Sequence, residues 1–208
     1  EQTHKLMEQA RMLNAINNRV IDTLGTVVEF RSMESGVHVF RIKFYTKILA
    51  ECVMKYYPEY GLTQETVDTI TSASSLHDVG KISIPDSVLL KPGRLTDDEF
   101  DLMKTHSMRG SEVIMAIAPV EGSEFFDCAN DIAKYHHERF DGRGYPCKLV
   151  GDDIPISAQI VSIADVYDAL THERCYKAAF APDVAYQMIM NGECGTFNPK
   201  LLDCFTKA

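Results

Sequence analysis

The chain has 208 residues, of which 45% are hydrophobic and 25% are charged, so it is long enough for one domain with a sizeable core and an appendage. Its net charge of -9 argues against a surface that binds polymeric nucleic acid, because such surfaces normally carry a basic stripe. No apolar run approaches the roughly 20 residues that cross a bilayer, and no signal-peptide pattern opens the chain.

The cysteines and the first residue bear on where the protein works. The six cysteines form no CxxC pair, and a chain of this size needs no disulfide framework, so we expect reduced thiols and a cytoplasmic location. The chain begins with Glu1 rather than Met. We therefore expect a fragment of a longer protein, such as the cytoplasmic part of a membrane-anchored one.

Residues 1–28 are predicted to form one long amphipathic helix. Apolar residues recur every seven positions, the spacing of a coiled coil, at Leu6, Leu13, Val20 and Val27. Two interpretations stay open: a first helix that packs on its own domain, or a connector that pairs two chains and links them to an upstream sensory or receiver domain. We divide the chain into this helix and a domain at 29–208.

The next two predicted helices each bring metal-capable side chains. One covers residues 31–57 and has Glu34 and His38 near its start, four residues apart and so on one face. The other begins after Thr63, a plausible N-cap, and reaches His77 and Asp78 near its end. Gly80 and Lys81 follow at once. This order of residues could place an imidazole and a bridging carboxylate on a dinuclear metal centre, with a lysine nearby for a phosphate oxygen.

Three further histidines lie on the two helices after that. Thr96 starts a capping box for a helix that carries His106, and a helix over residues 124–137 ends in His136 and His137. Adjacent side chains on a helix diverge by about 100°, so both could reach one metal cluster only if the helix ends there. The glycine-rich turn around Gly142 supplies that bend.

The helix predicted at residues 158–170 is almost entirely apolar but contains Asp165. A buried carboxylate needs a partner, and a metal ion would be one. Asp168 lies about one turn further on, and two short helices begin at Pro182 and at Asn198-Pro199. Because no useful β alternation occurs, the chain is predicted to be all-α, with roughly eight helices.

The collected motifs resemble those of the HD-GYP family of cyclic dinucleotide phosphodiesterases, a branch of the HD-domain metallohydrolases. The motifs occur in the family's order over about residues 25–205: HDVGK at 77–81, IPD at 84–86, LKPG at 90–93, KTH at 104–106, HHE with DGRGYP at 136–146, IADVYDA at 163–169 and RCYK at 174–177.

The resemblance implies an HD-domain helical bundle around a buried centre of two or three divalent metal ions, most often iron, with manganese as the alternative. The positions that match the family's ligands are Glu34, His38, His77, Asp78, His106, His136, His137 and Asp165. Asp78 is expected to bridge two ions, and Glu34 matches the extra carboxylate that accompanies a third. Mixed imidazole and carboxylate ligands also suit iron, manganese or zinc better than magnesium or calcium.

For the substrate, the resemblance implies hydrolysis of cyclic di-GMP to pGpG or GMP, with Asp78 and Lys81 as the catalytic residues. The residues expected to contact the substrate are Lys81, Tyr145, Asp168, Arg174 and Lys177. Two alternatives remain: a silent receptor that binds a cyclic dinucleotide without cleaving it, and an HD-type phosphohydrolase for another nucleotide such as cyclic GMP-AMP. A receptor normally loses metal ligands, and every matched position is filled here.

Overall fold

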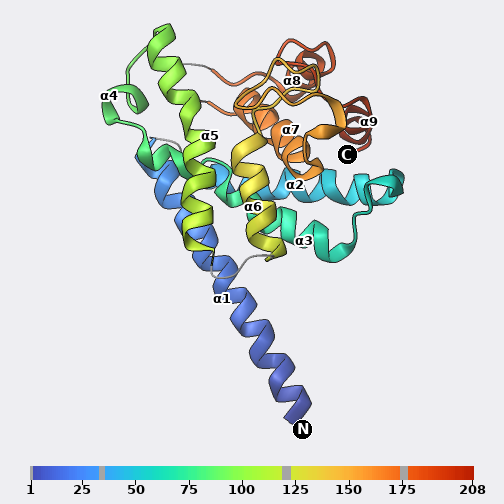
Figure 1. Ribbon diagram of the computed structural model, residues 1–208. Coiled ribbons are helices and arrows are strands. Elements are labelled where there is room, and N and C mark those ends of the chain that lie inside the picture. Colours follow the sequence, from blue (N-terminus) through green and yellow to red (C-terminus); the bar gives the residue numbers. More distant parts are fainter. Residues whose placement is uncertain (1, 33–35, 119–122, 174–177) are drawn as a thin grey trace.

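The computed structural model describes residues 2–32, 36–118, 123–173 and 178–208, and these ranges contain nine α-helices, four short 3₁₀ helices and no strand (Figure 1). The predicted all-α class is confirmed. The α-helices are α1 (Gln2–Arg31), α2 (Val37–Tyr56), α3 (Gln64–Ala73), α4 (Asp86–Leu89), α5 (Asp97–Ile117), α6 (Glu124–Tyr135), α7 (Ile156–Thr171), α8 (Pro182–Met190) and α9 (Pro199–Lys207). The 3₁₀ helices are η1 (Pro58–Tyr60), η2 (Ser74–Leu76), η3 (Val79–Ser83) and η4 (Gly151–Asp153).

Local capping signals set several helix starts. The Thr63 hydroxyl accepts from the Thr66 amide, and the Thr96 hydroxyl accepts from the Glu99 amide, each within a capping box. The Asn198 side chain likewise accepts from the amide of Lys200 at the start of α9. These starts agree with the sequence prediction. After Pro85 the chain forms the one-turn helix α4.

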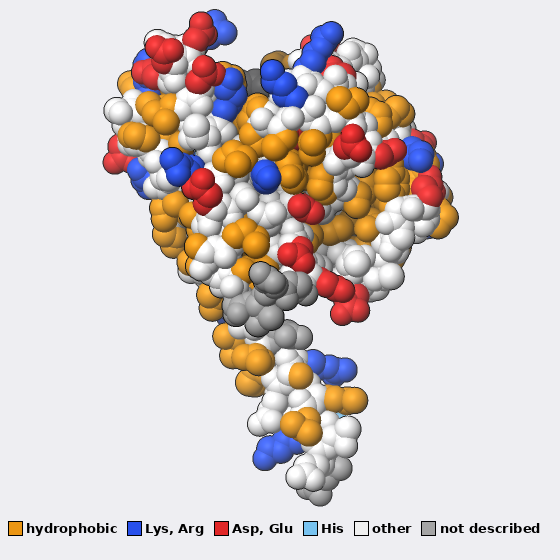
Figure 2. All heavy atoms as spheres, in the orientation of Figure 1, with side chains coloured by type: hydrophobic (Ala, Val, Ile, Leu, Met, Phe, Trp, Pro, Cys, Tyr) orange, Lys and Arg blue, Asp and Glu red, His pale blue; other side chains and the backbone are white. Residues whose placement is uncertain are grey.

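Helix α1 runs three residues further than predicted, to Arg31, so the proposed boundary between residues 28 and 29 falls inside it. Its first part projects away from the body of the molecule (Figure 1). The heptad residues Leu6, Leu13, Val20 and Val27 are 53–63% exposed, so a different face of α1 docks on the body. Figure 2 shows hydrophobic side chains exposed along this projecting helix.

Helices α2 and α7 lie at the centre and separate two apolar clusters. Leu49 of α2 and Ile163 of α7 belong to a cluster shared with α8 and α9. Ile42 and Val161, on the same two helices, belong to a cluster shared with α3, α5 and α6. Because α7 is buried on several sides, its polar residues must find partners inside the protein.

The described part of the chain contains neither a membrane-spanning helix nor a disulfide bond. None of its helices combines the length and apolar character that a membrane span requires. The five cysteines in this part of the chain form no disulfide with one another.

Candidate metal centre

The predicted histidines converge from four parts of the fold. His38 lies on the first turn of α2, and His77 follows η2, where the end of the third helix tightens into a 3₁₀ turn. His106 lies in the middle of α5. Helix α6 ends at Tyr135 and His136 is its C-cap, so the chain bends at the histidine pair as expected.

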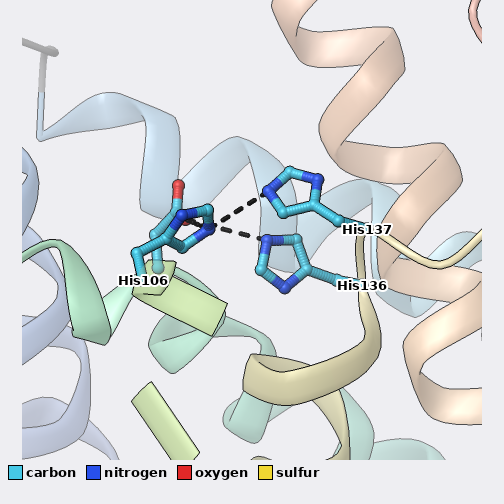
Figure 3. Close-up of side chains that lie close together, drawn as sticks. His106, His136 and His137 are labelled. Carbon is cyan, nitrogen blue, oxygen red and sulfur yellow. Dashed lines mark hydrogen bonds and ion pairs between the residues drawn. The ribbon is translucent and has the colours of Figure 1, made fainter. Parts of the chain in front are cut away.

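Asp78 and three histidines form a first group, in which one ligand atom from each residue lies within 4.8 Å of all the others. His106 Nε2 is 3.2 Å and His136 Nε2 is 3.7 Å from Asp78 Oδ1. His137 Nε2 is 3.1 Å from His106 Nε2. Figure 3 shows the His106 ring facing those of His136 and His137 from the opposite side of the site.

A second group, with the same 4.8 Å limit, consists of Glu29, His38, His77 and Asp78. His77 Nε2 lies 3.3 Å from Asp78 Oδ2, whereas the first group uses mainly Oδ1 of the same carboxylate. Asp78 therefore lies between two sets of ligands, which is the arrangement a bridging carboxylate requires.

Hydrogen bonds to the backbone orient the imidazoles. The Nδ1 atoms of His77, His106 and His136 lie 2.6–3.0 Å from the carbonyl oxygens of Ser74, Met103 and Ile132. Since a carbonyl only accepts, each Nδ1 carries a proton, and Nε2 is the ring atom that faces the centre. Within the described residues, the buried Nε2 of His77 and of His136 has no hydrogen-bond partner.

Asp168 orients His38 from behind. Its Oδ2 lies 2.6 Å from His38 Nδ1, and Arg41 donates to both carboxylate oxygens at 2.5 and 2.9 Å. The Asp168 side chain is 2% exposed, and Arg41 and His38 hold its pKa at about 2 although burial alone would raise it. A carboxylate that holds the distal nitrogen of a histidine is the usual support of a metal-binding imidazole.

The electrostatics also suit bound cations. Burial raises the pKa of Asp78, but Lys81 and His77 outweigh this effect and keep its pKa well below the ordinary value, so it stays ionised. Burial and the neighbouring rings of His136 and His106 push the pKa of His137 well below its usual range. A neutral imidazole and an ionised carboxylate are the forms that bind metal. The buried, oriented ligands therefore fit a divalent metal centre.

The remaining predicted residues lie at or near this centre where the structure describes them. Lys81 Nζ is 2.7 Å from Asp78 Oδ2, and Asp165 Oδ1 is 3.9 Å from His38 Nε2. The Tyr145 ring lies 4.7 Å from that of His137. Three predicted site residues lie outside the described ranges: Glu34, Arg174 and Lys177.

Glu138 holds the loop that brings Tyr145 back to the histidines. This carboxylate is 3% exposed and accepts from the amides of Cys147 at 2.6 Å and Leu149 at 3.1 Å. A Cβ on Gly144 would lie 2.3 Å from the Arg139 amide nitrogen, so only glycine fits this close return of the chain.

Sequence reasoning did not identify Glu29 as a site residue. The signal was present, because Glu29 interrupts the apolar run from Val27 to Phe30 in the same way that Asp165 interrupts α7. Glu29 lies just past the helix predicted at residues 1–28, and no motif includes it, so nothing in the sequence connected it with His77.

The HD-domain family profile matches residues 32–201. The chain is 43% identical over 188 residues, 89% of its length, to a cyclic di-GMP phosphodiesterase of Vibrio cholerae, and covers 38% of that protein. It is 38% identical to the cyclic di-GMP phosphodiesterase response regulator RpfG of Xanthomonas campestris, with 94% of this chain and 50% of that protein covered. The chain is also 40% identical to a 3'3'-cGAMP-specific phosphodiesterase of V. cholerae. That match covers 92% of this chain and 34% of the other protein.

A solved structure supports the fold alone. The crystal structure of a cyclic GMP-AMP specific phosphodiesterase from V. cholerae matches with a TM-score of 0.65 at 18% identity, over 91% of this chain and 48% of the other. The chain thus spans about a third to a half of the length of the relatives it matches. With the match over residues 32–201, the resemblance drawn from the motifs is confirmed, and the chain belongs to the HD-domain family.

Proposed function

We propose that this chain is the output part of a bacterial signalling protein and hydrolyses cyclic di-GMP to pGpG, or onward to GMP. The observation that carries the proposal is the pair of buried ligand groups that share Asp78, with Lys81 beside them. Relatives named cyclic di-GMP phosphodiesterases, 38–43% identical over about nine-tenths of the chain, support the choice of substrate.

We further propose that the centre binds two or three divalent metal ions. Iron is the preferred proposal and manganese the alternative, since imidazole and carboxylate ligands suit both metals. His106, His136, His137 and Asp78 would hold one ion, and His38, His77 and Asp78 another. Asp165, 3.9 Å from His38, and Glu34 are the remaining proposed ligands. Bound ions would supply Lewis acidity to the phosphate and to an attacking water.

The chain's own residues would then bind and orient the substrate. Lys81 lies at the edge of the centre, so its ammonium group is suited to neutralise the charge that develops on a phosphate oxygen. Tyr145 packs against His137 and would border the bound nucleotide. Arg174 and Lys177 are proposed to hold phosphate, and Asp168, which supports His38, keeps its predicted place among the substrate-binding residues.

The partners proposed for the wider protein follow from α1. Its exposed heptad stripe suits pairing with the same helix of a second copy and a link to an upstream sensory or receiver domain. The match to a response regulator agrees with that arrangement. We propose a cytoplasmic location, because the scattered cysteines suit a compartment in which thiols stay reduced.

Product analysis tests the proposal directly. Iron- or manganese-loaded protein, purified without oxygen, is incubated with cyclic di-GMP, and the products are separated by chromatography while metal is quantified in the same sample. We expect pGpG or GMP in proportion to bound metal, and neither metal nor product with Asp78→Ala. Turnover by Asp78→Ala would refute the site assignment.

A parallel incubation with cyclic GMP-AMP separates the second candidate substrate, which is supported by the relatives specific for 3'3'-cGAMP. Faster cleavage of cyclic GMP-AMP than of cyclic di-GMP would replace the proposed substrate. Binding of a cyclic dinucleotide by metal-loaded protein without any cleavage would instead identify a receptor.

A further inference from the structure

The last third of α1 is held firmly against the body of the protein. Asp22 accepts from Lys43 at 2.7 and 2.8 Å and from the Ser75 hydroxyl at 2.8 Å. A Cβ on Gly25 would lie 2.2 Å from the Ser75 carbonyl oxygen, so the helix approaches η2 backbone to backbone. This close docking directs the next turn of α1 towards the histidines.

Arg31 holds the end of the same helix. Its guanidinium donates to the carbonyl oxygens of Lys81, Ile82 and Ile84 at 2.6–3.0 Å and to Asp86 at 2.8 Å. Arg31 therefore binds η3 and the residues just after it. Helix η3 begins at the residue that follows Asp78 in the chain. The position of α1 relative to Asp78 is therefore set by hydrogen bonds at both ends of the docked part.

Glu29 lies between these two anchors and points into the protein. The residue is 1% exposed, and its Oε1 lies 3.7 Å from Lys81 Nζ. Lys81 Nζ is also 2.7 Å from Asp78 Oδ2, so one ammonium group lies between two buried carboxylates. Burial of a carboxylate is costly unless positive charge compensates it, and a nearby divalent ion would compensate both.

Glu29 also meets the geometric requirement for a ligand. One of its oxygens lies within 4.8 Å of the ligand atoms of His38, His77 and Asp78, all of which are buried. His77 Nε2 faces this group with its proton held on Nδ1 by the Ser74 carbonyl. Two imidazoles and two carboxylates make a ligand set suited to a first-row transition metal.

We propose that Glu29 is a ligand of the metal ion held by His38, His77 and Asp78, so that α1 forms part of the metal centre. The inference rests on the metal centre of the proposed function, and it adds a ligand that neither the motifs nor the relatives assign. It differs from the expectation for Glu34, because Glu29 lies on α1 and each of the two carboxylates can be substituted by itself.

The assignment has a consequence for α1 itself. If a residue of α1 is a ligand, bound metal should stabilise the docked position of α1, and docking of α1 should strengthen metal binding. The two equilibrium constants change by the same factor because the two equilibria are linked. Metal should then slow hydrogen exchange over residues 22–31, whereas residues 2–20, which are exposed wherever the structure describes them, should not respond.

The test compares Glu29→Gln with Glu8→Gln, a matched control that makes the same change on the exposed part of the same helix. Metal per chain is measured by elemental analysis and affinity by competition with a chelator. We expect Glu29→Gln to lose about one ion per chain, or to bind it at least about tenfold more weakly. It should also lose the metal-dependent protection of residues 22–31, while Glu8→Gln matches wild type.

Each other outcome has a defined meaning. Wild-type metal number, affinity and exchange protection in Glu29→Gln would overturn the inference, and so would loss of that ion in Glu34→Gln but not in Glu29→Gln. A wild type that binds no metal would refute the proposed function itself. If Glu29→Gln does not fold, Glu29→Asp withdraws the carboxylate by one methylene while keeping its charge. Unchanged metal affinity in Glu29→Asp would then count against direct ligation.

Discussion

Gly80→Ala should damage the metal centre without replacing any proposed ligand. A Cβ at this position would lie 1.9 Å from the His106 carbonyl oxygen, and 2.4 and 2.9 Å from the amide nitrogen and Cα of Gly110. These are backbone atoms, so no side chain can rotate away. The oxygen contact is roughly 1.5 Å shorter than ordinary van der Waals separation, and η3 must therefore move away from α5.

The movement has a predictable size and place. Overpacking of a close backbone contact costs about 3 kcal/mol of unfolding free energy, the upper part of the usual range, because α5 cannot deform locally. For a chain of this length that lowers the melting temperature by about 6–12 °C. The shift also separates Asp78, two residues before Gly80, from His106, whose Nε2 lies 3.2 Å from Asp78 Oδ1.

The assay is thermal unfolding of the metal-free protein, followed by metal titration. Ser83→Ala is the matched control: it lies on the same 3₁₀ helix and loses only the hydroxyl hydrogen bond to the Gly80 carbonyl, at 2.8 Å, worth about 1 kcal/mol. We expect Gly80→Ala to melt well below this control and to bind metal more weakly. A melting temperature within about 2 °C of wild type would show that η3 and α5 are not closely packed.

Four further changes test separate parts of the structure. Asp168→Ala should weaken metal binding about 10- to 100-fold by releasing His38, measured by chelator competition; unchanged affinity would contradict the orienting role. Glu138→Ala should free the loop around Arg143 and speed tryptic cleavage there, whereas wild-type cleavage rates would mean that other contacts hold it. Leu13→Glu should shift the chain to monomer in light scattering, and an unaltered mass would rule out pairing through the heptad stripe. Lys177→Ala should raise the dissociation constant for cyclic di-GMP at constant metal content; equal affinity would remove its phosphate role.

The sequence alone determined the features that depend on neighbouring residues. The helix starts at Thr63, Thr96 and Asn198 follow from local capping, which needs only three or four residues. The bend after His136 follows from the glycines of the next turn. The order of the histidine motifs also indicated an HD-domain bundle. Each motif is a run of only a few neighbouring residues, so it can be recognised without knowing the fold.

Only the tertiary structure decided which distant groups meet. Asp168 contacts Arg41, 127 residues earlier in the chain, and this pairing depends on how α2 packs against α7. Glu29 reaches the centre because Gly25 lets α1 approach η2 closely, a contact between segments about 50 residues apart. A periodic pattern shows which face of a helix is apolar, but a buried carboxylate on that helix acquires its partner only when another helix packs against it.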